Sequence, residues 1–173
     1  MTQQVQERTV TLEDEPVTLV GRMPCLGDAA PDFLAVAGDL STVAFSSFRG
    51  EPVVLSSVVS VDTDVCRAQT LRFNEEAGQL GPDVQILTLS MDLPFALERW
   101  RREEGVEDVI TLSDHRDAAF GTNYGLLMKD LRLLARAVLV VDREGVIRHK
   151  QIVPEVTDEP DYEAALAALK DWV

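Results

Sequence analysis

The sequence holds two cysteines, Cys25 and Cys66, and one of them stands where a thiol could act as a nucleophile. Directly before Cys66 come Asp62, Thr63 and Asp64, all residue types that favour the N-cap of a helix. A thiol in the first turn of a helix lies near free backbone N–H groups and the positive end of the helix dipole, which favour a thiolate. Cys66 is therefore a candidate nucleophile. The alternative is a small, buried hydrophobic residue without chemistry.

The segments on either side of Cys66 have the pattern of an α/β sheet. Residues 52–59 form a nearly continuous β-branched run, which predicts a strand buried on both faces at the centre of the sheet. Apolar residues then recur at helical spacing from Val65 until Gly81-Pro82 ends the helix. Cys66 thus follows the carboxyl end of a buried strand, the position at which open α/β sheets hold their active sites.

The other segments continue the alternation of strands and helices. A hairpin is expected at residues 10–19, and Pro160 is expected to open a final amphipathic helix. The remaining patterns predict strands at 33–36, 43–48, 84–90 and 109–112, a helix at 95–104, and an antiparallel hairpin at 137–147. The sequence contains no internal repeat or linker. We therefore expect one α/β domain over residues 1–173.

Charge and composition narrow the classes of function. Thirty acidic against 16 basic residues give a net charge of −14, which repels phosphate backbones and anionic membrane surfaces. Met1 to Gly21 carries acidic residues in place of the apolar core of a secretory signal, and no apolar stretch is long enough to span a bilayer. We expect a cytoplasmic protein that binds neither nucleic acid nor membrane. His115 and His149 lack the spacing of metal ligands, so no metal site is expected.

Five segments, in order along the chain, carry a family resemblance. They are Asp62-Thr63-x-Val65-Cys66, Asp92-Leu93-Pro94-Phe95-Ala96, Val109-Ile110-Thr111-Leu112-Ser113, Ala135-Arg136-Ala137-Val138 and Glu159-Pro160-Asp161-Tyr162-Glu163-Ala164-Ala165-Leu166. Together they resemble the bacterial thiol peroxidases, a subfamily of the peroxiredoxins. The resemblance implies a thioredoxin-like fold of the peroxiredoxin type with an N-terminal β-hairpin extension. It also implies a homodimer and no metal or organic cofactor.

The resemblance assigns roles to three residues. Cys66 matches the peroxidatic cysteine, Thr63 the hydroxyl that hydrogen-bonds thiolate and peroxide, and Arg136 the guanidinium beside them. Negative charge develops on the leaving oxygen during attack, so the chemistry needs a fixed donor and a permanent cation at the O–O bond. A surface ion pair is the alternative for Arg136. The implied activity is reduction of hydrogen peroxide or organic hydroperoxides through a Cys66 sulfenic acid, which thioredoxin or a small thiol then reduces.

The sequence departs from the family pattern at three positions. Val59 stands where the family has a proline, and Asp64 stands where a glycine is common. Arg101 occupies the position of the resolving cysteine that many thiol peroxidases carry. Cys25 is a candidate to replace it, with an unreactive loop thiol as the alternative. Trp100 is expected either to anchor a dimer contact between the helices at Cys66 and at 95–104 or to lie in the monomer core.

Two other functions are alternatives to the peroxidase. Thiol–disulfide exchange is disfavoured, because Gln69 stands where the second thiol of a Cys-x-x-Cys motif would be. The other is a non-catalytic redox sensor or binding module, a peroxidase scaffold altered at Val59, Asp64 and Arg101. Fast, peroxide-specific oxidation of the thiol distinguishes the enzyme from this module.

Overall fold

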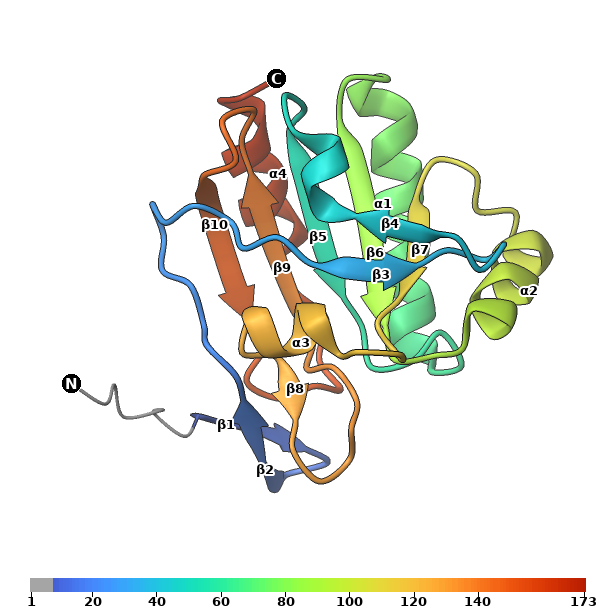
Figure 1. The fold of residues 1–173 in the computed structure, drawn as a ribbon, viewed down its shortest axis with the longest axis vertical. Coiled ribbons are helices and arrows are strands. Elements are labelled where there is room, and N and C mark those ends of the chain that lie inside the picture. The colour runs from blue at the N-terminus through green and yellow to red at the C-terminus, as the bar shows by residue number, and fades with distance from the viewer. Residues whose placement is uncertain (1–7) are drawn as a thin grey trace.

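A computed structural model describes residues 8–173 and contains a mixed seven-stranded sheet (Figure 1). β5, β6 and β7 run parallel, and the other strands are added antiparallel on both sides. In sheet order the strands are β10 (Ile147–Ile152), β9 (Ala137–Val141), β5 (Val53–Ser57), β6 (Gln85–Ser90), β7 (Ile110–Ser113), β3 (Leu34–Val36) and β4 (Thr42–Ala44). The predicted α/β class and the antiparallel late hairpin are confirmed.

Helices cover both faces of the sheet, and each face has its own apolar core (Figure 1). On one face, residues of α1 (Asp64–Leu80), α2 (Pro94–Glu104) and α4 (Tyr162–Lys170) pack against side chains of β5, β6 and β9. The short helix α3 (Ala119–Asn123) lies over the other face, where Phe120 packs edge to face on Phe33 with ring centroids 5.1 Å apart. This arrangement buries β5 on both faces, as its sequence predicts.

A second sheet of three strands lies at the end of the molecule where α1 begins (Figure 1). β1 (Arg8–Leu12) and β2 (Glu15–Val20) form the predicted N-terminal hairpin, and β8 (Leu127–Met128) pairs with β2. The hairpin turns at Glu13 and Asp14, whose φ angles of 53° and 66° are the positive values that a two-residue turn requires. Residues 1–7, part of the segment in which no secretory signal is expected, lie outside the described residues.

The strand predicted at 43–48 is wrong in its second half. β4 ends at Ala44, and Phe45–Phe48 forms a 3-10 helix, η1. The cause is one local and one longer-range hydrogen bond, since the Ser47 hydroxyl donates to the Ala44 carbonyl at 2.7 Å and the Ser46 N–H donates to Asp32, 14 residues earlier, at 2.8 Å. These bonds offer the backbone an alternative to a strand.

Other boundaries differ in smaller ways. β5 ends at Ser57 instead of Val59, and β6, not β5, is the middle strand of the seven. The last helix begins at Tyr162 instead of Pro160, because Asp161 caps it by accepting a hydrogen bond from the Ala164 N–H at 3.0 Å. The sequence patterns did not predict α3 or β8, which are too short to show a period.

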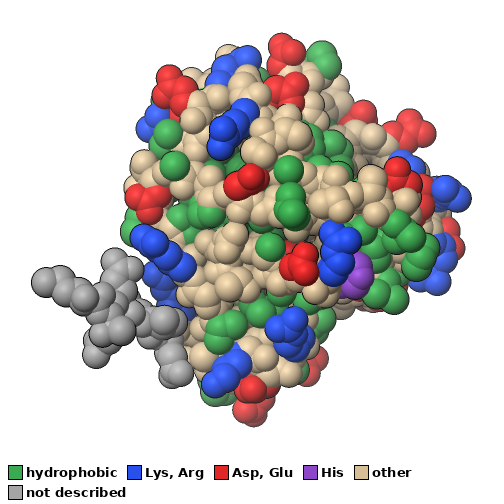
Figure 2. Space-filling view, viewed as in Figure 1, with side chains coloured by type: hydrophobic (Ala, Val, Ile, Leu, Met, Phe, Trp, Pro, Cys, Tyr) green, Lys and Arg blue, Asp and Glu red, His purple; other side chains and the backbone are tan. Residues whose placement is uncertain are grey.

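Charges of both signs are spread over the face shown in Figure 2, with apolar side chains between them. The described chain contains no helix that is both long and apolar enough to cross a membrane.

Candidate active site

The predicted nucleophile lies in the first turn of α1, and Thr63 caps this helix. Thr63 Oγ1 accepts a hydrogen bond from the Cys66 N–H at 3.4 Å and donates one to the Ser60 carbonyl at 3.1 Å. Cys66 has no exposed surface. Burial alone would fit an inert hydrophobic thiol equally well. The polar groups that face the sulfur therefore decide what this residue can do.

Arg136 is the polar group that meets the sulfur. It directly precedes β9, is 1% exposed, and donates from Nη2 to Cys66 Sγ at 3.3 Å. Its Nη1 donates to Gln69 Oε1 at 2.7 Å and its Nε to the Val156 carbonyl at 2.8 Å. Because a buried charge is costly unless hydrogen-bonded, three such partners are needed to hold the guanidinium here. Arg136 is thus not a surface ion-pair partner, and that alternative is excluded.

Gln69 also belongs to this cluster, a role that the sequence does not predict. It is fully buried one turn after Cys66, and its Nε2 donates to Ser56 Oγ at 2.8 Å. The amide therefore links the guanidinium of Arg136 to strand β5. The sequence contains one indication of this role, because Gln69 is a polar residue three positions after Cys66 and thus lies on the same face of the helix.

Apolar side chains close the rest of the site. Val59, at the position of the family proline, is 8% exposed and packs in the same apolar cluster as Cys66. The substitution therefore keeps an apolar cover near the sulfur, without the fixed φ of proline. The other buried members of this cluster are Val10, Leu19, Val58, Met128, Ala135 and Val156.

Asp92 holds the loop between β5 and α1 in place. Its carboxylate accepts hydrogen bonds from Ser60 Oγ at 2.7 Å, from the Val61 N–H at 2.9 Å and from Ser90 Oγ at 2.8 Å. This loop ends at Thr63, the cap of α1. Asp92 thereby fixes the backbone from which Thr63 and Cys66 project.

Comparison with known proteins identifies the family. The Redoxin family pattern matches residues 26–166. The chain is 51% identical over 160 residues to the thiol peroxidase of Oceanobacillus iheyensis, covering 92% of this chain and 97% of that protein. It is 50% identical over 161 residues to the thiol peroxidase of Listeria innocua, with coverage of 93% and 97%. The chain belongs to the thiol peroxidase family.

Solved structures confirm the fold of this thiol peroxidase. A peroxiredoxin-like protein from Aquifex aeolicus superposes with a TM-score of 0.90 at 37% identity, covering 96% of this chain and 98% of that one. The thiol peroxidase from Chromobacterium violaceum superposes with a TM-score of 0.84 at 26% identity, with coverage of 94% and 95%. The predicted thioredoxin-like fold of the peroxiredoxin type, its N-terminal hairpin and the enzyme class of a thiol-dependent peroxidase are confirmed. A non-catalytic module is not favoured.

Arg101, at the position of the usual resolving cysteine, has a structural part in the thiol peroxidase. Two of its nitrogens donate to the Glu98 carboxylate at 3.1 Å, and Nη1 donates to the Val106 carbonyl at 3.1 Å. The hydrogen bond from Arg101 holds the pKa of Glu98 below its usual value. The guanidinium thus fastens the end of α2 to the segment that leads into β7. Its neighbour Trp100 is 6% exposed and packs in the monomer core.

Cys25 lies apart from Cys66. It is an exposed residue of the connector between the hairpin and β3, and its N–H donates to Asp28 at 2.8 Å. The connector follows β10, since the Gly27 N–H donates to the Ile147 carbonyl at 2.9 Å. Both cysteines are free thiols. Of the residues selected from the sequence, the structure brings Thr63 and Arg136 to Cys66 and leaves Cys25 outside the cluster.

The two histidines also lie outside this cluster. His115 Nδ1 is 2.9 Å from Ser113 Oγ, and burial lowers the pKa of His149. Among residues 8–173 no group of three or more His, Cys, Asp and Glu side chains is placed to hold a metal ion.

Proposed function

We propose that this thiol peroxidase reduces hydrogen peroxide or organic hydroperoxides with Cys66 as the nucleophile, assisted by Thr63 and Arg136. The observation that carries the proposal is the buried contact of 3.3 Å between Arg136 Nη2 and Cys66 Sγ. A permanent cation beside a thiol favours the thiolate, which is the nucleophilic form. The same cation can stabilise the negative charge that develops on the peroxide.

The first step consumes the peroxide. The Cys66 thiolate attacks one peroxide oxygen, an S–O bond forms, and the O–O bond breaks. The electron pair of that bond leaves on the second oxygen, which takes up a proton to become water or an alcohol. Cys66 becomes a sulfenic acid. Arg136 supplies a hydrogen-bond donor for this step, and Thr63 supplies a second when its hydroxyl turns from the Ser60 carbonyl to the peroxide. No metal or organic cofactor takes part.

An external thiol then restores the enzyme. The thiol attacks the sulfenic sulfur, a mixed disulfide forms, and water leaves. A second thiol attacks the mixed disulfide and releases Cys66 and the disulfide of the reductant. We propose thioredoxin or a small thiol as this reductant, because Arg101 cannot be oxidised and Cys25 is fixed in a connector along β10. Two other routes to reduction of the Cys66 sulfenic acid rank below this one. The first is attack by Cys25 after a rearrangement, and the second is attack by a cysteine of another chain.

The enzyme is further proposed to act as a cytoplasmic homodimer. Leu93 and Phe95 at the start of α2 are 56% and 64% exposed, which gives that end of the helix an apolar surface. These two side chains, in place of the buried Trp100, are suited to anchor a contact between protomers. We expect a dimeric mass in light scattering at micromolar concentration and a monomeric mass for Phe95→Lys. A monomeric wild-type protein would contradict this contact.

Stopped-flow oxidation tests the peroxidase proposal itself. The reduced protein is mixed in separate experiments with hydrogen peroxide, with an alkyl hydroperoxide, and with a disulfide whose size is similar to that of the alkyl hydroperoxide. Oxidation of Cys66 that is much faster with peroxides than with the disulfide supports the proposal. Slow oxidation at similar rates by all three would show a scaffold without peroxidase chemistry.

A further inference from the structure

The carboxylate of Glu155 is the most heavily hydrogen-bonded side chain next to the N-terminal hairpin. Oε2 accepts from Thr11 Oγ1 at 2.7 Å and from the Asp14 N–H at 3.1 Å. Oε1 accepts from the Glu13 N–H at 3.1 Å, and from the N–H and the hydroxyl of Thr157 at 3.1 and 2.7 Å. Glu155 therefore accepts hydrogen bonds from five donors, although it does not itself contact Cys66 or Arg136.

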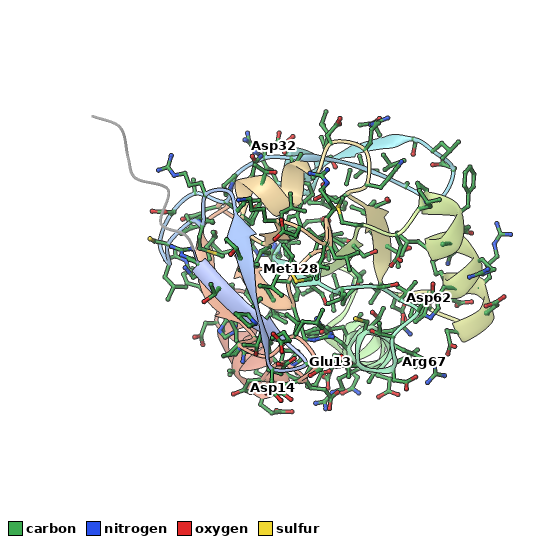
Figure 3. All side chains as sticks on the ribbon, turned by 90° about the horizontal axis from the view of Figure 1, so that it is seen from below. Glu13, Asp14, Asp32, Asp62, Arg67 and Met128 are labelled. Atoms are coloured by element: carbon green, nitrogen blue, oxygen red, sulfur yellow. The ribbon has the colours of Figure 1, made fainter. Side chains whose placement is uncertain are left out.

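Three of these donors, those of Thr11, Glu13 and Asp14, tie the hairpin to the segment after β10, and the two from Thr157 lie within that segment. Backbone bonds reinforce the tie, because the Thr11 N–H donates to the Pro154 carbonyl at 2.8 Å and the Val156 N–H donates to the Thr11 carbonyl at 2.9 Å. Figure 3 shows Glu13 and Asp14 at the hairpin tip, on the side of the molecule where Asp62 and Arg67 mark the start of α1. The hairpin is thus fastened at the end of the molecule that holds Cys66.

The same segment contacts the buried arginine. The carbonyl of Val156, the residue after Glu155, accepts the hydrogen bond from Arg136 Nε at 2.8 Å. Val156 is 1% exposed and packs in the apolar cluster of Cys66. Any shift of the segment would move this carbonyl, and the guanidinium that it orients would follow.

We propose that Glu155 is a positioning residue of the peroxidase, which fixes the guanidinium of Arg136 against Cys66 by clamping the hairpin onto the Val156 segment. The inference rests on the proposed role of Arg136 in the reaction. On this proposal the N-terminal hairpin has a function, which is to hold the side chain of Arg136 in position.

The chemistry of the clamp requires a carboxylate. All five partners are donors, and only an ionised carboxylate offers two oxygens with acceptor sites alone. An amide would turn an NH₂ group either toward the Asp14 N–H or toward the N–H groups of Glu13 and Thr157 and leave them unpaired, whereas the threonine hydroxyls could turn and accept. The hairpin pairs with only the two residues of β8 in its own sheet, so its position also depends on these anchors.

Replacing Glu155 by glutamine tests the clamp, with Asp158→Asn as the matched control. Asp158 is an exposed carboxylate of the same segment. We expect Glu155→Gln to slow the oxidation of Cys66 by peroxide by roughly 10- to 100-fold, the range that misplacement of a catalytic group by about 1 Å produces. Asp158→Asn is expected to react like the wild type. An unchanged rate in Glu155→Gln would overturn the proposal.

A double-mutant cycle with Arg136→Lys shows whether Glu155 acts through Arg136. If it does, Glu155→Gln slows the wild type but has little further effect in the Arg136→Lys background. An equal slowing in both backgrounds would reduce Glu155 to a structural residue and overturn the proposal. A wild-type rate in Arg136→Lys alone would instead refute the proposed role of Arg136, so the two failures are distinguishable.

A second variant keeps the test decisive if Glu155→Gln does not fold. Thr11→Val removes one of the two shortest bonds to the carboxylate and leaves the charge in place. We expect it to slow the oxidation of Cys66 by several-fold, again without a further effect in the Arg136→Lys background. A wild-type rate in Thr11→Val, or equal slowing in both backgrounds, would contradict the clamp.

Discussion

Arg136→Lys is the substitution for which the structure predicts the largest effect at constant charge. The guanidinium donates to three buried acceptors in different directions, namely Cys66 Sγ, Gln69 Oε1 and the Val156 carbonyl. An ammonium on a flexible stem cannot reproduce this planar fork. The charge stays in the pocket, but the geometry at the sulfur is lost.

The sizes of the expected losses in oxidation rate and in stability follow from the hydrogen bonds that Arg136→Lys removes. A donor that stabilises developing negative charge is worth about 2.7–4 kcal/mol in the transition state, so the rate of Cys66 oxidation should fall by roughly 10²- to 10³-fold. A buried acceptor left without its donor costs about 1–3 kcal/mol. Because lysine can satisfy only part of the set, Arg136→Lys should also lower the free energy of unfolding by about that amount.

Single-turnover oxidation by peroxide measures the first effect, and urea unfolding measures the second. Rates are compared under conditions in which both proteins are fully folded. Arg67→Lys is the matched control, since Arg67 directly follows Cys66 but pairs with Glu104 at 2.6 Å on the surface. A surface pair of this kind is worth little, and the control should oxidise at close to the wild-type rate. A wild-type rate in Arg136→Lys would refute the reasoning about the guanidinium.

Three further outcomes are expected. Gln69→Leu should slow oxidation by about tenfold, because it removes the acceptor that orients Arg136 Nη1, and a rate within twofold of wild type would exclude this role. After one equivalent of peroxide, intact masses of wild type and Cys25→Ser should both gain one oxygen, whereas a loss of two hydrogens in wild type alone would identify Cys25 as the resolving thiol. The hydroxyl of Thr11, followed by that of Thr157, lowers the pKa of Glu155 from 4.5 to about 2. A carboxyl group whose pKa is lowered on folding stabilises the fold at every pH above its ordinary pKa, and this stabilisation is lost as the pH falls toward the lowered pKa. The difference in unfolding free energy between wild type and Glu155→Gln should therefore persist from pH 7 to about 5 and narrow as the pH falls from 4.5 toward 2. A difference in unfolding free energy that stays constant from pH 7 to pH 2 would show that the charge of Glu155 does not stabilise the fold.

Local sequence patterns predict most of the fold and single out Cys66 as the candidate nucleophile. The N-cap residues before Cys66 and the β-branched run before them are contiguous in sequence, so one short segment specifies both the strand and the helix start. The strand prediction is wrong at Phe45–Phe48 because the apolar residues there fit a strand, while the bonds from Ser46 and Ser47 that bend the chain depend on Asp32 and on local geometry.

The supporting residues of the site could not be predicted in the same way. Gln69 and Glu155 act through contacts that span 67 residues to Arg136 and 144 residues to Thr11. No periodicity or motif within one segment encodes such contacts. The proposed roles of Cys66, Thr63 and Arg136 come from the family resemblance, which supplies long-range information that a single sequence lacks.

Cys66 is the residue that we expect peroxide to oxidise. The most direct measurement is peroxide consumption by Cys66→Ser and by Cys25→Ser under identical conditions, with thioredoxin and its reductase or with dithiothreitol as the reductant. We predict that Cys66→Ser, folded by circular dichroism, consumes no peroxide above the protein-free control and that Cys25→Ser retains turnover. Turnover at the wild-type rate in Cys66→Ser would contradict the account.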